Sequence, residues 1–361
     1  MKQYRVPFFD QLHAELGARG VQLRVVYSAP DARERGIGDH AELDVAYGRK
    51  VPALRLPRGA VWQGAWGELM EADLAVVEQA NKHAINYPLL ALARLGCKRV
   101  AFWGHGRNRQ GDPRALGERV KRSTLRLADW WFAYTAGTAQ YLIDRGVDGA
   151  RITTVQNAID LTTFRADLAA VDRLESRRAL GLDEAAPVGL FCGALVRQKQ
   201  IERLLAAADR LRTRLPGFTL LIAGAGPEEA RVAAAAATRP WCRQLGPRFG
   251  ADKARLFRIS DVVLNLGVVG VVALDAAAAA LPLITTDVAG HGPEIEYVEP
   301  GVTGLITRAD DDAYASAVAA LLGDPAERAR MGVRAAAAAQ GYSMAAMVER
   351  FASGVMRWVS A

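Results

Sequence analysis

The sequence predicts an α/β protein made of two doubly wound parallel-sheet domains, and three observations lead to that prediction. Short runs rich in β-branched and aromatic residues alternate with longer amphipathic, Ala-rich segments, which is typical of a parallel sheet covered by helices. The 361 residues fit two domains of ordinary size. A composition of 51% hydrophobic and 24% charged residues indicates a folded chain with hydrophobic cores.

The first half of the chain alternates strands and helices. The expected strands are residues 21–27, 74–78, 99–103, 131–135 and 152–155. The expected helices are 7–17, 84–95, 113–128 and 137–145. A helix pattern that begins by Pro7 leaves no room for the strand that usually opens a doubly wound domain. We therefore expect the first strand to be missing, and a start codon assigned too late is favoured over loss of the strand.

The second half repeats this rhythm, with strands expected near 188–192, 218–223, 262–264 and 282–285. Residues 157–167 have weak periodicity and turn-forming residues, so they are expected to be the linker between the halves. The last glycine-rich segment, 285–306, is expected to be a loop followed by a hairpin-like turn. We find no sequence repeat, so the similarity of the halves is architectural.

Three classes of protein are disfavoured by composition. The most apolar stretch, 264–287, is interrupted by Asn265, Gly267 and Asp275, so it cannot be a membrane span. Asp10 cuts the only early apolar run short, so we expect no signal peptide and a cytoplasmic protein. Cys97, Cys192 and Cys242 form no C-x-x-C pair, which argues against disulfides or zinc and predicts three small core residues.

The positive charge is concentrated in one region. The whole net charge of +7 lies in residues 1–165, and the stretch from Arg94 to Arg126 holds ten basic residues against Asp112 and Glu118. Such a patch attracts anionic headgroups, phosphorylated substrates or nucleic acid. The alternative is a solvated Arg-rich helix. A nucleic-acid binder is disfavoured because base-stacking aromatic residues are not interleaved with the basic ones.

Two strand–loop–helix junctions in the second half offer groups for an anion. Gly193 follows one strand, and Arg197 and Lys199 come just before a helix expected from about Gln200. Two cations at a helix N-terminus can hold a diphosphate. Gly224 and Gly226 follow the next strand, but Glu229 stands where a dinucleotide fingerprint needs a small residue. NAD and FAD are therefore disfavoured, and these glycines can instead form a tight turn.

Two further junctions complete a possible ligand site. The segment with Arg248 and Phe249 precedes a helix and offers a place for a flat base. The amides of Gly270, Val271 and Val272 open the helix after strand 262–264 and are expected to point at a phosphate. Asp275 follows one turn later, where its carboxylate can accept hydrogen bonds from ribose hydroxyls. The alternative is an exposed Asp on the outer face of the helix.

These motifs together resemble those of GT-B glycosyltransferases of family 4 (group 1). The segment 193–205 (GALVRQKQIERLL) is similar to the family motif G-R-L-x-x-x-K-G. Residues 262–287 resemble the E-G-F-G-x-x-x-x-E-A-x-A-x-G-x-P-V-I segment, and 291–306 resemble the downstream P-E and N-G signature. Near the N-terminus, YRVPFFDQL, VAFWGHGRN and VQNAIDLTTF are similar to family members.

The resemblance implies the GT-B fold, in which two Rossmann-like domains face a central cleft. Residues 1–163 would bind the acceptor, 164–343 would bind the nucleotide sugar, and a helix at 344–361 would cross back to the first domain. Lys199 would hold the donor diphosphate and Asp275 the ribose, with His105 near the reacting sugar. The implied donor-binding residues are Gly193, Arg197, Lys199, Gly224, Arg248, Phe249, Gly270, Val271, Val272 and Asp275. The implied acceptor-binding residues are Glu78, His105 and Arg107.

The implied function is that of a retaining, metal-independent glycosyltransferase that needs no cofactor. It would move a hexose from a nucleoside-diphosphate sugar to a saccharide or lipid-linked acceptor, in exopolysaccharide or O-antigen assembly. The basic stretch would hold it on the inner face of an anionic membrane. Two departures favour an alternative: Ala194 replaces the usual Arg and Gly267 the first Glu. A branch with G-x-V-G in place of E-G-F-G has a similar segment. The alternative is a pseudoenzyme that binds a partner or ligand.

Overall fold

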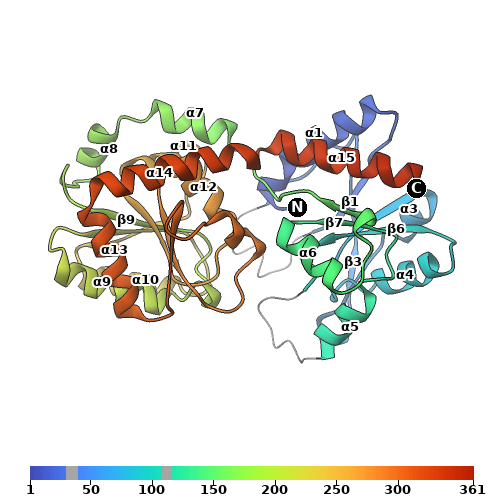
Figure 1. Cartoon of the computed structure of the whole chain (residues 1–361), viewed down its shortest axis with the longest axis horizontal. Coiled ribbons are helices and arrows are strands. Elements are labelled where there is room, and N and C mark those ends of the chain that lie inside the picture. Colours follow the sequence, from blue (N-terminus) through green and yellow to red (C-terminus); the bar gives the residue numbers. More distant parts are fainter. Residues whose placement is uncertain (30–39, 108–115) are drawn as a thin grey trace. The chain divides into compact units, whose positions relative to one another are not determined.

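The computed structural model describes residues 1–29, 40–107 and 116–361 (Figure 1). Contacts between residues divide the chain into two compact units. Unit 1 comprises Met1–Ile159 and Met344–Ala361, and unit 2 comprises Asp160–Ser343. Unit 2 thus begins at Asp160, whereas the sequence places the boundary at 163/164. The last segment of the chain belongs to the same unit as the first.

Unit 1 is an α/β unit. Its described helices are α1 (Val6–Ala18), α3 (Trp66–Glu71), α4 (Asn86–Arg94), α5 (Leu116–Thr124), α6 (Ala136–Asp144) and α15 (Met344–Ser360), with 3-10 turns η1 (Gln3–Arg5), η2 (Pro57–Gly59) and η3 (Gly149–Arg151). Its described strands are β1 (Val25–Ser28), β2 (Gly48–Val51), β3 (Ala53–Arg55), β4 (Val61–Gln63), β5 (Leu74–Glu78), β6 (Arg99–Gly104), β7 (Trp130–Ala133) and β8 (Ile152–Thr154).

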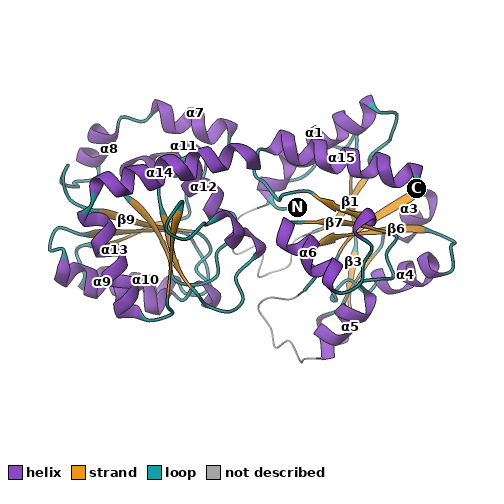
Figure 2. Cartoon of the chain, viewed as in Figure 1, coloured by secondary structure: helices purple, strands orange, loops and turns teal. Residues whose placement is uncertain are grey.

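Strands β5, β6, β7 and β8 form a parallel sheet in that order (Figure 2). A hydrophobic core packs against each face of this sheet. Alternate residues of a strand point to opposite faces. Phe132 packs with α1 and α15, whereas Trp131 packs with α4 and α6. Phe132 stacks on Phe351 of α15 with ring centroids 4.0 Å apart. Segment 344–360 therefore completes the core of unit 1.

Unit 2 is a second α/β unit. Its helices are α7 (Thr162–Ala170), α8 (Arg173–Ala179), α9 (Ile201–Arg214), α10 (Glu229–Thr238), α11 (Gly250–Ile259), α12 (Val272–Ala278), α13 (Asp311–Gly323) and α14 (Pro325–Ala339), with 3-10 turns η4 (Arg197–Lys199), η5 (Pro293–Tyr297) and η6 (Gln340–Tyr342). Its strands are β9 (Val188–Cys192), β10 (Thr219–Ala223), β11 (Cys242–Gly246), β12 (Val262–Asn265), β13 (Leu283–Thr286) and β14 (Gly304–Thr307).

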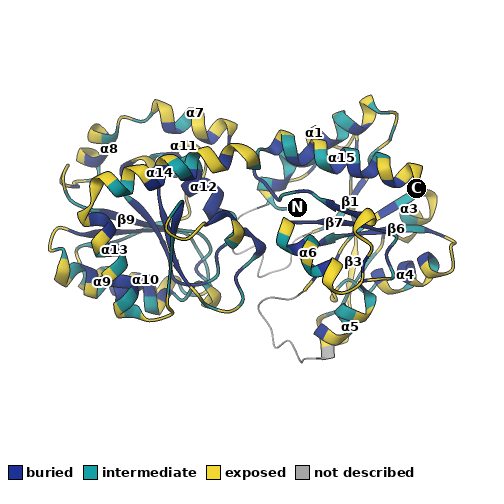
Figure 3. Ribbon diagram, in the orientation of Figure 1, coloured by how far each residue is buried: buried dark blue, intermediate teal, exposed yellow. Residues whose placement is uncertain are grey.

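The sheet of unit 2 is parallel throughout, in the order β11-β10-β9-β12-β13-β14. This is the order 3-2-1-4-5-6 of a doubly wound nucleotide-binding fold, and the strand order reverses between β9 and β12. Leu220, Ile222 and Leu264 share a buried cluster with residues of α9, α10 and α13 (Figure 3). In such sheets ligands bind outside the carboxyl ends of the strands at the reversal.

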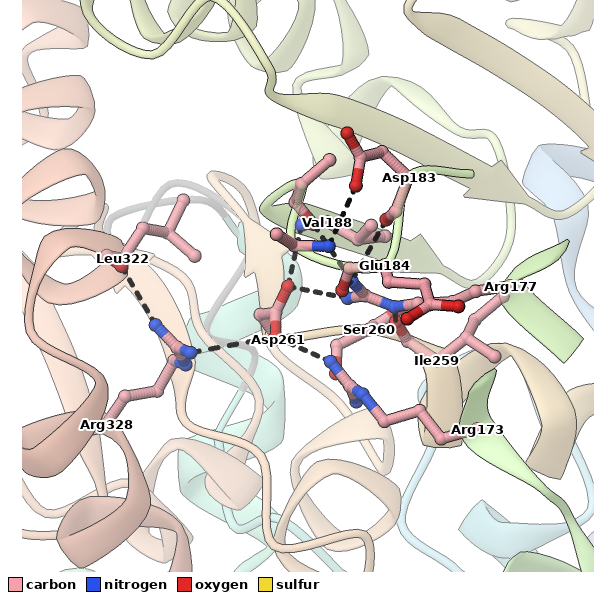
Figure 4. Close-up of polar contacts among 12 residues, drawn as sticks. Arg173, Arg177, Asp183, Glu184, Val188, Ile259, Ser260, Asp261, Leu322 and Arg328 are labelled. Carbon is pink, nitrogen blue, oxygen red and sulfur yellow. Dashed lines mark hydrogen bonds and ion pairs between the residues drawn. The ribbon is translucent and has the colours of Figure 1, made fainter. Parts of the chain in front are cut away.

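The amino ends of β9 and β12 are tied together by the Asp261 cluster, which comprises Asp261, Arg173, Arg177 and Arg328 (Figure 4). Both Asp261 oxygens accept hydrogen bonds, from Arg173 at 2.7 Å and from Arg177 at 2.9 Å. The amide of Val188 donates to Asp261 at 2.8 Å. Arg177 is 2% exposed and also donates to the carbonyls of Ile259, Glu184 and Ala186. The amino ends of β9 and β12 are therefore joined by charged groups that are hydrogen-bonded to one another and to the backbone.

Several expectations for secondary structure are wrong. Half of the expected linker, 157–167, lies in α7, because Phe164 packs edge-on against Phe257 of α11 with centroids 5.4 Å apart. The expected strand 21–27 is only β1, which pairs with β2 and not with the main sheet. The expected turn is present at 301–303, but the residues after it form β14, which pairs parallel to β13 and so makes no hairpin with it.

Two other expectations need correction or restriction. Cys97 is exposed and Cys192 half-buried, so of the three cysteines only Cys242 is a buried core residue. The expected helix 113–128 begins outside the described residues, and its described part is α5.

Candidate functional site

The loops that follow β9 and β12 meet where the strand order of unit 2 reverses. The amide of Val268 donates to the carbonyl of Gln198 at 2.9 Å. Lys199 Nζ donates to the carbonyl of Val268 at 2.5 Å. Two loops that are about 70 residues apart in sequence are thus joined through backbone groups at the place where doubly wound folds bind their ligands.

Gly267 has a packing role that the sequence does not reveal. A Cβ atom at this position would lie 2.1 Å from the Gln198 oxygen and 2.6 Å from the backbone of Lys199. The close approach of the two loops therefore requires glycine. Gly267 occupies the position of the family's first Glu in the resemblance, and a glutamate here would separate the loops. The departure from E-G-F-G thus has a structural reason.

Buried side chains fix the 266–269 loop, and the sequence prediction omits them. Asn265 Nδ2 donates to the Gly267 oxygen at 2.9 Å, and Thr286 Oγ1 donates to the Leu266 oxygen at 2.7 Å. His291 Nδ1 accepts from the amide of Val269 at 3.1 Å, and His291 Nε2 lies 2.6 Å from the Thr286 oxygen. Because Nδ1 accepts, the Nε2 atom must carry the proton that reaches Thr286. The H-G-P-E segment contains His291, but only the fold shows this contact.

Lys199 is half-buried at this junction. Desolvation lowers the pKa of its ammonium from 10.5 to about 8, although the charge of Glu294 and the thiol of Cys192 raise it. Burial likewise raises the pKa of Cys192 to about 12, so this thiol is protonated at neutral pH. The ammonium of Lys199 lacks solvation and would gain from a second anionic partner.

Gln200, next to Lys199, has a strained backbone. Its φ is +54°, in the left-handed region that non-glycine residues rarely adopt. It occupies the position of the glycine that ends the family motif K-G in the resemblance. Its side-chain oxygen accepts from Arg203 at 2.7 Å. Strain of this kind persists where the surrounding structure enforces it, often beside a ligand site.

Asp275 is a buried carboxylate of α12 that pairs with a lysine of a neighbouring helix. It is 4% exposed in α12, so the alternative of an exposed outer-face Asp is wrong. Lys253 Nζ of α11 donates to its Oδ1 atom at 2.6 Å and lies 5.1 Å from the Phe164 ring centroid. Burial raises the pKa of Asp275, and Lys253 opposes that rise. The sequence gives no sign of this ion pair, which joins residues on different helices.

The glycines after β9 and β10 allow two loops to touch. A Cβ atom on Gly224 would lie 1.9 Å from the Gly193 oxygen, and one on Gly226 would lie 2.5 Å from the Leu195 oxygen. The amide of Leu195 donates to the Ala225 oxygen at 2.9 Å. These glycines therefore allow the backbones of the two loops to touch. Such a packing role needs no bound dinucleotide.

The remaining donor-site candidates lie at the carboxyl edge of unit 2. Arg197 is exposed in η4. Arg248 and Phe249 are exposed after β11, and Phe249 is 49% exposed. Gly270 and Val271 lie just before α12, and Val272 is its first residue. The first amides of a helix have no partner within the helix and are available to an acceptor.

The acceptor-site candidates lie at the carboxyl ends of the unit 1 strands. Glu78 ends β5, with its Oε2 atom 3.5 Å from His83 Nε2. His105 follows β6 and contacts the Tyr134 ring edge-on, with centroids 4.2 Å apart. Arg107 is exposed, and its guanidinium lies 5.0 Å from the Tyr141 ring centroid. Glu78 and His105 follow adjacent strands at the same edge.

The basic stretch from Arg94 to Arg126 is not one exposed face. Lys98 is buried and donates to the carbonyls of Met70 and Ala72. Arg99 donates to the carbonyls of Trp358 and Val359 at the end of α15. Arg94, Arg107, Arg119 and Arg126 are exposed, and Arg109 and Arg114 lie outside the described residues. Among the described residues, every helix is too short or too polar to span a membrane.

Comparisons with known proteins match both units. A family model described as Glycosyltransferase Family 4 matches residues 8–163, and one described as Glycosyl transferases group 1 matches residues 186–324. D-inositol 3-phosphate glycosyltransferase of Nocardia farcinica is 33% identical over 252 residues, which are 65% of this chain and 53% of that protein. The match thus spans about half the length of this curated relative.

Solved structures share the fold. Sucrose-phosphate synthase from Thermosynechococcus elongatus aligns with a TM-score of 0.71 at 19% identity, covering 98% of this chain and 93% of that one. Anabaena HepE in complex with UDP aligns with a TM-score of 0.63 at 18% identity, covering 80% of each chain. These alignments confirm the predicted GT-B fold for this chain.

Proposed function

The chain belongs to the family 4 glycosyltransferases of group 1, and on that premise we propose that it is a retaining glycosyltransferase that moves a hexose from a nucleoside-diphosphate sugar to a saccharide or lipid-linked acceptor. The observation that carries this proposal is Lys199, a desolvated cation at the strand-order reversal of unit 2. We place the diphosphate of the donor against its Nζ atom.

A diphosphate would give the desolvated ammonium of Lys199 an anionic partner. Charge-assisted hydrogen bonds from an ammonium to a phosphate are stronger than neutral ones. The amino end of α9, a helix that begins at Ile201, adds a positively polarised helix terminus beside it. The amides of Gly270, Val271 and Val272, together with exposed Arg197, are the further groups that we assign to the donor phosphates.

The proposed reaction breaks the bond between the anomeric carbon and the diphosphate oxygen, and forms a bond from that carbon to an acceptor hydroxyl oxygen on the same face. The hydroxyl proton passes to the departing diphosphate. Negative charge grows on the diphosphate as it leaves, and a fixed cation with oriented helix amides stabilises such charge. On this basis we propose that leaving-group stabilisation comes from Lys199 and the helix termini, without a metal ion.

Asp275 has two candidate roles in this proposal. As the carboxylate of the E-x7-E position it would accept hydrogen bonds from the ribose. Its ion pair with Lys253 supports a second role, in which the pair ties α11 to α12. The variant Asp275→Asn distinguishes the two roles. If Asp275 binds the ribose, the variant has a lower nucleotide affinity and nearly unchanged stability. If Asp275 ties the two helices together, the variant is less stable.

Unit 1 would supply the acceptor site, with Glu78, His105 and Arg107 at the carboxyl edge of its sheet. The relatives support a hydroxyl-rich acceptor, since one is named for an inositol phosphate and another for a sugar phosphate. Glycan assembly at the inner face of a bacterial membrane, with contact through exposed Arg94, Arg119 and Arg126, is the setting that we propose.

The test is a binding and turnover panel with UDP-, GDP- and TDP-sugars on the full chain. We expect one nucleotide to bind and its sugar to be transferred or slowly hydrolysed. Lys199→Ala should weaken nucleotide binding by about 10- to 100-fold and turnover by more, because it removes a charge-assisted contact to the leaving group. Lys50→Ala is the matched control, because Lys50 is exposed and pairs with Glu42.

The alternative function, a pseudoenzyme that binds a ligand or partner, is favoured by the internal pairing of Asp275 with Lys253 and by Ala194. Nucleotide binding that depends on Lys199, with no turnover on any donor, would establish it. Undiminished binding and turnover in Lys199→Ala would contradict both functions.

A further inference from the structure

Arg5 is a buried cation in unit 1 to which nothing above gives a function. It ends the η1 turn just before α1, and it is 9% exposed. Its guanidinium lies 4.5 Å from the ring centroid of Trp103 and 5.4 Å from that of Tyr134. Its Nη2 atom donates to the Tyr134 hydroxyl at 2.9 Å.

Within residues 1–29, 40–107 and 116–361, Arg5 forms no ion pair with a carboxylate, and Glu78 favours its charge without a direct contact. Its Nη1 atom is buried and has no hydrogen-bond partner within the described part of the chain. Burial opposes the charge, but Tyr134, Tyr4 and the more distant Glu78 favour it, so that the pKa of Arg5 is raised and the guanidinium stays ionised. Contacts to aromatic rings stabilise the cation, but the Nη1 donor still has no acceptor among the described residues.

Arg5 also lies at the functional edge of its unit. Trp103 is near the carboxyl end of β6, and Tyr134 follows β7 directly. Tyr134 in turn contacts His105, a proposed acceptor-site residue. Gln79, which follows β5 and is 6% exposed, has an Oε1 atom without a partner in the described residues. An incompletely hydrogen-bonded cation therefore sits where the acceptor is proposed to bind.

We propose that Arg5 forms a subsite for an oxyanion, a phosphate or a carboxylate, carried by the acceptor. This rests on the proposed function and specifies the chemical class of the acceptor: an anionic sugar, cyclitol or lipid-linked saccharide. Nη1 supplies the open donor, and a guanidinium can hold an oxyanion by two parallel hydrogen bonds. Because Nη1 is not in contact with solvent in this structure, binding involves a rotation of the guanidinium or of Tyr4, whose ring packs on it.

The probe is inorganic phosphate, titrated calorimetrically into the full chain with UDP present at saturation, so that the site in unit 2 is filled. We expect saturable phosphate binding that weakens at least tenfold in Arg5→Gln and is largely kept in Arg5→Lys. Arg24→Gln is the matched control, since Arg24 is an exposed arginine of the same unit that pairs with Glu71 at 3.5 Å. Repeating the titration with acetate tells a phosphate subsite from one that also accepts carboxylates, and either result supports an oxyanion subsite.

Equal phosphate affinity in the wild-type chain and in folded Arg5→Gln would overturn the proposal. If Arg5→Gln fails to fold, the wild-type chain still decides: the side-chain NMR signal of Arg5, identified by its loss in Arg5→Lys, must shift as phosphate saturates, and an unchanged signal overturns the proposal. UDP binding is measured in the same samples. Its failure would contradict the proposed function, whereas a failure of phosphate binding alone contradicts only the subsite.

Discussion

The two edges of the unit 2 sheet use charged residues in opposite ways. At the amino edge, Asp261 receives hydrogen bonds from Arg173, Arg177 and the amide of Val188, so the buried charges of the Asp261 cluster are matched by partners. At the carboxyl edge, Lys199 is desolvated and donates to one carbonyl at 2.5 Å. At the amino edge the charged groups are hydrogen-bonded to one another, which stabilises the fold. At the carboxyl edge the charge of Lys199 is suited to a ligand.

This difference teaches that burial alone does not identify a functional charge. Arg177, at 2% exposure, is buried as deeply as a core leucine, yet its donors are used by carbonyl groups and by Asp261. Lys199 differs in its partners: its ammonium donates to the carbonyl of Val268, and desolvation lowers its pKa to about 8. Substitutions at the two edges should therefore separate stability from binding.

Breaking the amino edge should have the largest effect on stability. Asp261→Asn removes the charge that pairs with buried Arg177, and we expect the free energy of unfolding to fall by about 3–5 kcal/mol, as for other broken buried pairs. Denaturant unfolding measures this loss. The nucleotide affinity of the folded fraction should not change, because the cluster lies at the opposite end of the strands.

Asp312→Asn is the control for that change. Asp312 pairs with Arg214 at 2.7 Å but is 66% exposed, so its loss should change the free energy of unfolding much less than Asp261→Asn does. Similar losses for the two variants, or a nucleotide affinity that falls in Asp261→Asn, would remove the distinction between the edges.

Gly267 tests whether contact between the two carboxyl-edge loops matters. In Gly267→Ala the added Cβ atom would lie 2.1 Å from the Gln198 oxygen, so the loops must separate. We expect a loss of about 1–3 kcal/mol in unfolding free energy and weaker nucleotide binding. Gly323→Ala is the control, because nothing lies within 4 Å of a Cβ atom there. If both glycines tolerate alanine equally, the loops are not held by close packing at Gly267.

The smallest expected effect on stability comes from substitutions of Gln200. Gly and Ala both remove its hydrogen bond to Arg203, but only Gly adopts a φ of +54° without strain. We expect Gln200→Gly to be more stable than Gln200→Ala by about 1 kcal/mol, the cost of a left-handed residue. Thermal unfolding of the pair measures this difference. Equal stability would show that the turn before α9 relaxes.

The fold follows from sequence where hydrophobic periodicity is strong. The structure has β5 at Leu74–Glu78 and β9 at Val188–Cys192, as the sequence predicts, because each is a short β-branched or apolar run between turn signals. The strands β2, β3 and β4 have only three or four residues each, of which Val51 alone is buried, and no such signal. Helix α7 depends on the contact of Phe164 with α11, which local sequence cannot show.

The candidate site is predictable only as a set of motif positions. The spacing and the resemblance single out Lys199, Asp275 and the loop glycines, and their roles remain predictions. The partner of Asp275, Lys253, belongs to another helix, and the contact of Gly267 with Gln198 joins distant loops. Such contacts arise from the strand order, which places loops after β9 and β12 side by side.

The protonation of Lys199 makes the stability of the folded chain depend on pH. Its pKa of about 8 in the folded chain lies below the ordinary value of 10.5. The unfolded chain therefore binds more protons between these two values, and stability should rise with pH in that window. Below pH 8 the full cost of burying the ammonium is present. A bound diphosphate would favour the ammonium and raise its pKa.

The most direct measurement of the central claim, that Lys199 binds the donor diphosphate, is proton uptake on UDP binding at pH 8. Calorimetry in two buffers of different ionisation enthalpy gives the number of protons taken up. We predict uptake of about half a proton per UDP by the wild-type chain, and almost none by Lys199→Arg, whose guanidinium is already ionised. UDP binding without proton uptake, or with equal uptake in both proteins, would contradict the account.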